Sequence, residues 1–334
     1  MDRMNFTQAV ARLRVLEKRL LNELKFERMI DASSAMEALR VLQETEYSAF
    51  MGNVKKPEDY DLLLKEELKR VYDLMYEVSP DKSIVDIMSL KYDYHNLKVL
   101  LKGKILGKDL DYLLMDSGSI KVEKLKLIIT TEDYKALPEL MREAFLEAEK
   151  VFSIDKDPQK IDVIIDRYLY KDLVKRAQTS EYEFIKEYMK SNIDFINVRT
   201  YIRLKKQQKP FKFFSEVYIE GGAIKEEFFF KYYEGSLENI MEEIPSFIKY
   251  KDVIKKGIED YISTGRLSSF EKLWEDYIMK KAKEAKYVHF GAEPIVSYII
   301  AKETEIKLLR IVMVGKINNL PIESIRERLR DVYV

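Results

Sequence analysis

Apolar residues recur at intervals of three and four along residues 90–105, and this spacing strongly limits how the segment can fold. The residues concerned are Leu90, Tyr94, Leu97, Leu101 and Ile105. At about 3.6 residues per turn, these positions share one face of an α-helix. Gly107 follows them, and glycine ends a helix well because it accepts a positive φ without a Cβ clash. The pattern predicts a long amphipathic helix over residues 84–106.

The same pattern returns twice, and each time charged residues accompany it at fixed positions. Each copy has an acid, then a basic residue, then a lysine, at the same spacing. The acids are Asp93, Asp194 and Glu305, the basic residues are Lys98, Arg199 and Arg310, and the lysines are Lys104, Lys205 and Lys316. Helical periodicity would align the apolar positions of any two helices, but it would not also align three charges. The sequence therefore predicts three related helices.

Segments around these copies support a larger repeat. Residues 118–121 read Gly-Ser-Ile-Lys after the first copy, and residues 222–225 read Gly-Ala-Ile-Lys after the second. Ser34, Thr131 and Ser236 precede the three copies, and each offers a hydroxyl that can cap a helix start. The copies recur roughly every 100 residues, much farther apart than solenoid repeats of 20 to 50. We expect an all-α protein of three similar modules, 1–115, 116–220 and 221–334, arranged with pseudo-threefold symmetry.

The rest of the chain also favours helices, since only 11 glycines and 8 prolines interrupt 334 residues. Further helices are expected at 7–24, 36–50, 61–76, 161–177, 182–206 and 321–330. Residues 211–235 are rich in phenylalanine, which is typical of strands. They lack strict alternation, however, so we expect helix there as well.

Composition limits the kinds of partner and site. The 58 basic and 58 acidic residues balance, which argues against nucleic acid or an anionic membrane as the main partner but does not exclude a local patch. The sequence has no cysteine, so disulfides and thiol chemistry are excluded. No signal peptide is recognisable, and the longest apolar stretches fall far short of the roughly 20 residues of a membrane span.

Motifs of catalysis or cofactor binding are not recognisable either. Gly103-Lys104, Gly107-Lys108 and Gly315-Lys316 are each followed by the wrong residue for a phosphate-binding loop. His95 and His289 are too far apart in sequence for a His-Glu-x-x-His zinc motif. We expect no catalytic residue, no cofactor and no metal site. The repeated charges suit solvated or inter-helix ion pairs best, an interface second and catalysis last.

One run carries a family resemblance. Residues 92–104, Y-D-Y-H-N-L-K-V-L-L-K-G-K, resemble the signature of the C subunits of archaeal and bacterial A/V-type rotary ATP synthases, which are related to the d subunits of eukaryotic V-type ATPases. Residues 290–294 and 301–318 resemble the C-terminal block of that family, and residues 11–21 and 44–47 resemble its N-terminal block. Leu308 is a departure, because many members of that family carry a polar residue there. The resemblance covers nearly the whole chain.

The resemblance implies a funnel-shaped, non-catalytic central-stalk subunit. Such a subunit links the membrane rotor ring to the soluble central shaft, on the cytoplasmic face of the membrane and without a span of its own. A helical scaffold or adaptor with no rotary role stays an alternative, and an all-α enzyme a more distant one. As an interface hypothesis, we expect some of the repeated cations to meet the shaft, namely Lys98, Arg199, Arg310, Lys104, Lys205 and Lys316.

Overall fold

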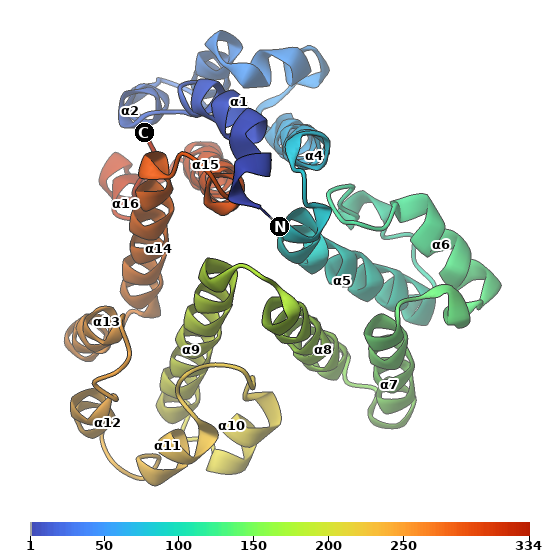
Figure 1. Ribbon diagram of the computed structural model, residues 1–334, viewed down its shortest axis with the longest axis vertical. Helices are drawn as coiled ribbons and strands as arrows, with labels where there is room; N and C mark the ends of the chain where they lie inside the picture. Colours follow the sequence, from blue (N-terminus) through green and yellow to red (C-terminus); the bar gives the residue numbers. More distant parts are fainter. Residues whose placement is uncertain (1) are drawn as a thin grey trace. The chain divides into compact units, whose positions relative to one another are not determined.

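The computed structural model describes residues 2–334, and within them the chain consists of helices joined by loops, with no β-strand. Figure 1 shows the helices in chain order. The chain forms two compact units. The first contains residues up to Met88 together with Lys272–Val334, and the second is Ser89–Glu271. The boundaries between the two units fall inside two long helices, α5 (Lys82–Leu106) and α14 (Leu267–Glu284).

The first unit is built around one long helix, α15 (Glu293–Ile317), which packs against four helices from the N-terminal part of the chain. These are α1 (Thr7–Glu17), α2 (Glu23–Asp31), α3 (Ala35–Arg40) and α4 (Tyr60–Val78), and the short α16 (Ile322–Arg326) follows α15. Four 3₁₀ helices lie in the N-terminal part at Arg3–Phe6, Val41–Glu44, Glu46–Asn53 and Pro57–Asp59, and a fifth, Ala285–Tyr287, precedes α15. Ile295, Ile299 and Leu309 are fully buried, so α15 forms the centre of this core.

The second unit contains the rest of α5 and the helices up to the start of α14. These helices are α6 (Val122–Thr131), α7 (Glu139–Asp155), α8 (Pro158–Thr179), α9 (Glu183–Lys206), α10 (Phe211–Val217), α11 (Glu226–Lys231), α12 (Leu237–Glu243) and α13 (Lys251–Thr264), with 3₁₀ turns at Asp111–Leu113 and Tyr134–Ala136. The pairs α7–α8, α8–α9 and α12–α13 pack together. Tyr201 on α9 lies among the rings of Phe214 and Phe229, which joins α10 and α11 to that helix.

The three predicted long helices are confirmed as α5, α9 and α15, and we call them the anchor helices. Gly107 follows α5 with φ +61°, as its place after the apolar pattern predicted. The phenylalanine-rich stretch is helical, as α10 and α11. Gly257 on α13 lies close to α14, since a Cβ there would be 2.3 Å from the ring of Phe270.

Four predicted boundaries are wrong. The helix expected at 321–330 is the shorter α16, which ends at Arg326. The helix expected at 7–24 is two helices, α1 and α2, because Asn22 caps α2 and the chain breaks before it. The helix expected at 36–50 is an α-helix only as far as Arg40, the end of α3, and the chain then continues as two 3₁₀ helices. Thr131 ends α6 instead of starting a helix, since Glu132 adopts the left-handed conformation with φ +56°. The modules 1–115, 116–220 and 221–334, and their pseudo-threefold arrangement, stay a prediction.

Candidate functional site: the repeated polar positions

The acid of the first anchor helix holds the loop that leads into α6. Asp93 is fully buried on α5. Its carboxylate accepts hydrogen bonds from the backbone N–H of Ser119 (3.0 Å), the Ser119 hydroxyl (2.7 Å) and the N–H of Ile120 (3.0 Å). These donors lie just before α6, so the side chain fixes where α6 begins. Burial raises the pKa of Asp93, although the bonds from Ser119 and Ile120 oppose this.

The acid of the second anchor helix does the same for α11. Asp194 accepts from the N–H groups of Ala223 (3.0 Å) and Ile224 (2.9 Å), and from the hydroxyl of Tyr250. Burial again raises its pKa, and the bonds from Tyr250 and the two backbone groups oppose the rise. The two contact sets therefore match in both geometry and electrostatics.

A glycine makes room for each of these two acids. A Cβ on Gly118 would lie 2.1 Å from Oδ1 of Asp93, and a Cβ on Gly222 would lie 2.1 Å from Oδ1 of Asp194. No real Cβ can approach a carboxylate oxygen that closely, so only glycine fits at either position without a shift of the backbone. This explains why the Gly-x-Ile-Lys sequence follows both helices.

The acid of the third anchor helix binds a loop from the other end of the sequence. Glu305 on α15 is 4 % exposed. It accepts from the backbone N–H of Leu21 at 2.5 Å, just before α2, and from the hydroxyl of Tyr47 at 2.8 Å. The N-terminal segment therefore takes the place that residues 118–121 and 222–225 take in the other copies.

Two of the three repeated lysines reach the far end of the same short helices. Lys316 donates to the carbonyls of Ile30 (2.8 Å) and Ala32 (2.5 Å) at the end of α2. Lys205 donates to the carbonyls of Tyr233 and Gly235, just after α11. Cations are favoured where helix carbonyls lack partners. Acid and lysine together thus hold the two ends of one short helix against the anchor helix.

Lys104 occupies the same position but has acidic partners. Its ammonium lies 2.9 Å from carboxylates of Glu132 and Glu149 and donates to the hydroxyl of Tyr134. Burial would lower the pKa of Lys104, but the bonds to these partners raise it. Burial lowers the pKa of Lys205, which bonds neutral carbonyls.

The three repeated basic residues each pair with an acid on another helix of their own unit. Lys98 lies 2.8 Å from Asp166 on α8. Arg199 lies 3.2 Å from Glu271 on α14. Arg310 lies 2.6 Å from Asp61 on α4. The exposed fractions of the basic side chains differ, at 19 % for Lys98, 31 % for Arg199 and 47 % for Arg310.

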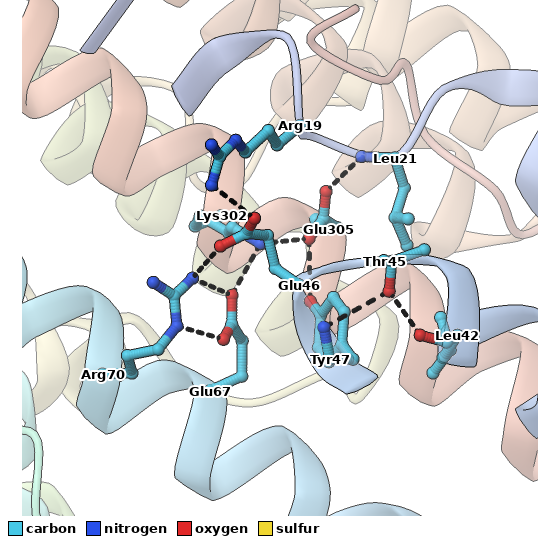
Figure 2. Close-up of polar contacts among 10 residues, drawn as sticks. All are labelled: Arg19, Leu21, Leu42, Thr45, Glu46, Tyr47, Glu67, Arg70, Lys302 and Glu305. Atoms are coloured by element: carbon cyan, nitrogen blue, oxygen red, sulfur yellow. Dashed lines mark hydrogen bonds and ion pairs between the residues drawn. The ribbon is translucent and has the colours of Figure 1, made fainter. Parts of the chain in front are cut away.

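A buried ionic network lies beside Glu305, and Figure 2 shows it. The ammonium of Lys302, with a side chain 1 % exposed, lies 2.7 Å from Glu67 on α4 and 2.7 Å from Glu305. Arg70 binds Glu67 through two nitrogens, at 2.7 and 2.9 Å. Glu46 extends the network toward the surface, where Arg70 and Arg19 pair with it.

The contacts of the network favour the charged forms of Glu67 and Lys302. Burial alone would raise the pKa of Glu67, but hydrogen bonds from Arg70 and the charge of Lys302 lower it overall. Burial opposes the protonation of Lys302, yet Glu305 and Glu67 raise its pKa. Burial raises the pKa of Tyr47 well above its ordinary value, and Glu305 adds to the rise. The network therefore joins α4, α15 and the N-terminal loops by fixed charges.

Sequence reasoning missed Lys302 and Glu67. A signal was available for Lys302, which follows the apolar run 294–301 and lies on the same helix face as Tyr298 and Glu305. Glu67 gave no signal, because an acid in the middle of a charged helix is usually solvated. Leu308 is buried at the position where Asn96 and Asn197 bind loop backbone.

Two other kinds of feature are absent from residues 2–334. No group of three or more acidic or histidine side chains is placed to hold a metal ion there. No helix in that range is both long and apolar enough to cross a bilayer. His95 has a structural contact, since one of its ring nitrogens lies 2.9 Å from the carbonyl oxygen of Leu113.

The chain also matches a known protein family over most of its length. A sequence model of the family described as "ATP synthase (C/AC39) subunit" matches residues 9–328. The chain belongs to this family. The match spans all three anchor helices and the N-terminal segment that Glu305 binds, so the whole set of repeated positions lies inside it.

Individual relatives are similar in sequence to this chain over nearly its whole length. The C subunit of the V-type sodium ATPase of Enterococcus hirae is 29 % identical over 322 residues, which cover 96 % of this chain and 97 % of the relative. The C subunit of the A-type ATP synthase of Methanocaldococcus jannaschii is 27 % identical, over 96 % of this chain and 84 % of the relative. The C subunit of the V-type ATP synthase of Thermus thermophilus is 23 % identical, over 97 % and 98 %.

Proposed function

We propose that this family member is a non-catalytic central-stalk subunit of a rotary ATPase, which links the membrane rotor ring to the soluble central shaft. The observation that carries the proposal is the family match over residues 9–328, together with relatives of nearly the same length that are named as C subunits of such enzymes. The protein would lie on the cytoplasmic face of the membrane as a peripheral component.

The repeated contacts suit a part that transmits force. The repeated acids and cations hold helix ends and join helices within their units. Closely packed helices with fixed ends have low compressibility and transmit strain. In this role the isolated chain is expected neither to bind ATP with micromolar affinity nor to hydrolyse it, which calorimetric titration and a phosphate-release assay would check.

Purification of a tagged chain from detergent-solubilised membranes tests the proposal. We expect the catalytic head, the shaft subunits and the rotor ring to co-purify with the chain. Recovery of an unrelated protein without any ATPase subunit would favour the alternative, a helical adaptor with no rotary role. Loss of the chain from membranes that retain an active ATPase complex would contradict the coupling role.

The interface hypothesis for the repeated cations can be sharpened by the structure. Arg310 is the most exposed of the three basic residues, at 47 %, so we propose that it contributes most to shaft binding. Reversal of its charge alone would also break the pair with Asp61. The double variant Arg310→Asp, Asp61→Arg keeps an internal pair while moving the positive charge.

Shaft binding should weaken in this exchanged variant and depend less on salt, because surface charge steers association and is screened by ions. The matched control exchanges Lys307 and Glu275, a pair 2.6 Å apart on α15 and α14. Equal affinity for the native chain and both exchanged variants would place the interface elsewhere.

A further inference from the structure

A strongly basic segment follows the second anchor helix in a chain whose charges otherwise balance. Between residues 203 and 214 the sequence contains arginine, lysine, glutamine, leucine, proline and phenylalanine, and no acid. Together with the end of α11, this segment forms what we call the basic–aromatic surface. Its members are exposed: Arg203, Lys206, Lys209, Lys212, Phe213, Phe230 and Lys231.

The surface rests on a rigid aromatic base. The ring of Phe211 lies 5.0 Å from that of Phe230 and 5.1 Å from that of Tyr233, both edge to face. The hydroxyl of Tyr233 donates to the carbonyl of Lys209 at 2.7 Å, which fixes the loop between α9 and α10. Figure 1 shows α10 and α11 beside the C-terminal half of α9. The exposed side chains therefore project from an ordered platform.

Two phenylalanines are exposed on this platform. Phe230 is 65 % exposed and Phe213 is 44 % exposed. The ammonium of Lys209 lies over the Phe213 ring, 5.1 Å from its centre, so a cation and an aromatic ring are exposed together. Exposed aromatic rings at a solvent-facing helix end lose hydrophobic stabilisation unless a partner covers them.

Four of the five cations of the surface lack the acidic partners found at the corresponding end of the first anchor helix. There, Lys104 pairs with Glu132 and Glu149, and Lys126 pairs with Asp111. Within residues 2–334, no carboxylate pairs with Arg203, Lys206, Lys209 or Lys212; Lys206 donates only to the carbonyl of Gly265, at 3.3 Å.

The nearest acids of α10 and α11 act on other groups. The charge of Glu216 acts on Lys160, and those of Glu226 and Glu227 act on Tyr218. Glu234 acts on the partly buried Lys205. The charge of Glu243 acts on Lys231. The other four cations of the surface have no carboxylate paired with them among the described residues.

We propose that the basic–aromatic surface docks on the headgroups of an anionic lipid bilayer. Lysines bury their alkyl stems against apolar surface and extend the ammonium toward phosphate, and aromatic rings favour the boundary between headgroups and acyl chains. Lysines close to a membrane surface are attracted to anionic lipid, over a range of about one Debye length. An acidic protein would satisfy the cations, but it would not by itself account for two exposed phenylalanines. This inference goes beyond the coupling role and does not depend on it.

Vesicle binding by the full chain tests the proposal. We expect the chain to sediment with vesicles of phosphatidylglycerol and phosphatidylcholine, less so at high salt, and not with phosphatidylcholine alone. The double variant Lys209→Gln, Lys212→Gln should lower the partition coefficient by about 25-fold, or about fivefold for each charge. The double variant Phe213→Ser, Phe230→Ser should lower it by about fivefold or more.

Matched controls come from another part of the same unit. Lys124→Gln with Lys135→Gln removes two exposed lysines, and Leu127→Ser removes an apolar side chain that is 63 % exposed. These variants should bind vesicles as the native chain does, and far-UV circular dichroism should show the native helix content in all of them.

Three results would overturn the proposal. The first is no binding to the anionic vesicles at low salt. The second is an equal loss of binding in control and surface variants, which would indicate a general charge effect. The third is binding to polyglutamate, lost in the lysine variant, without binding to vesicles. That result would identify the surface as a docking site for an acidic protein.

Discussion

Replacement of Lys302 by methionine tests the structural importance of the buried network. Methionine is of similar length and lacks the charge, so the change removes the ammonium that lies 2.7 Å from both Glu67 and Glu305. Glu67 keeps its two bonds to Arg70. Glu305 keeps only the bonds from Leu21 and Tyr47, and its buried charge loses its cation.

The expected decrease in the free energy of unfolding follows from the loss of the cation beside Glu305. Removing one partner of a buried pair costs about 3–5 kcal/mol, because the remaining charge stays desolvated. Glu305→Gln in the Lys302→Met background removes that charge. The amide oxygen can take the place of Oε2 and accept from the N–H of Leu21, while the amide NH2 takes the place of Oε1 and can donate to the hydroxyl of Tyr47. We expect the second substitution to restore about 1–3 kcal/mol, so the two effects should be clearly non-additive.

Fluorescence of the single tryptophan provides the assay. Trp274 is 3 % exposed and lies in the same unit as Lys302, so its emission reports the unfolding of that unit in urea. The matched control is Lys307→Met, which removes an ammonium 2.6 Å from Glu275 at a lysine side chain that is 49 % exposed. Exposed pairs contribute about 0–1 kcal/mol.

Two outcomes would refute this reasoning. If Lys302→Met shifted the urea midpoint no more than Lys307→Met, the network would not stabilise the unit. If Glu305→Gln added to the cost of Lys302→Met instead of reducing it, an uncompensated charge on Glu305 would not be the cause.

Two further predictions concern pH and a close contact. The pKa of Glu67 is lowered and that of Lys302 is raised on folding, so the stabilisation lost in Lys302→Met should be constant from about pH 5 to 10. It should fall as pH drops through the lowered pKa of Glu67 or rises through the raised pKa of Lys302; a pH-independent difference in urea midpoint would contradict this. Gly222→Ala should cost about 2–4 kcal/mol in calorimetry, since its Cβ would lie 2.1 Å from Asp194, whereas Gly52→Ala, with nothing within 4 Å, should change stability by less than about 0.5 kcal/mol.

The long helices could be predicted from the sequence because their signals are local. The apolar spacing and Gly107 suffice for α5, and the repeat extends the argument to α9 and α15. The charged repeat predicted related helices, and matching contacts at Asp93 and Asp194 give it a structural basis.

The wrongly predicted helix boundaries depend on contacts between distant parts of the sequence. Leu20 and Leu24 fit the helical pattern of residues 7–24, but the chain breaks where Leu21 donates to Glu305, 284 residues away. Thr131 carries a hydroxyl that suits either helix end, and here it donates back to the carbonyl of Leu127. No local pattern distinguishes these cases, so the boundaries could not be predicted.

The contacts between α15 and the N-terminal helices also determine when the first unit can fold during synthesis. Residues 89–271 form a continuous unit, which can fold as soon as they have left the ribosome. Glu67, by contrast, is synthesised long before Lys302, and at about 5–20 residues per second it waits on the order of tens of seconds for its partner. During that time the faces of α1, α2 and α4 that later cover α15 have no helix to pack against. The N-terminal part of a nascent chain should therefore be bound by chaperones until synthesis is nearly complete.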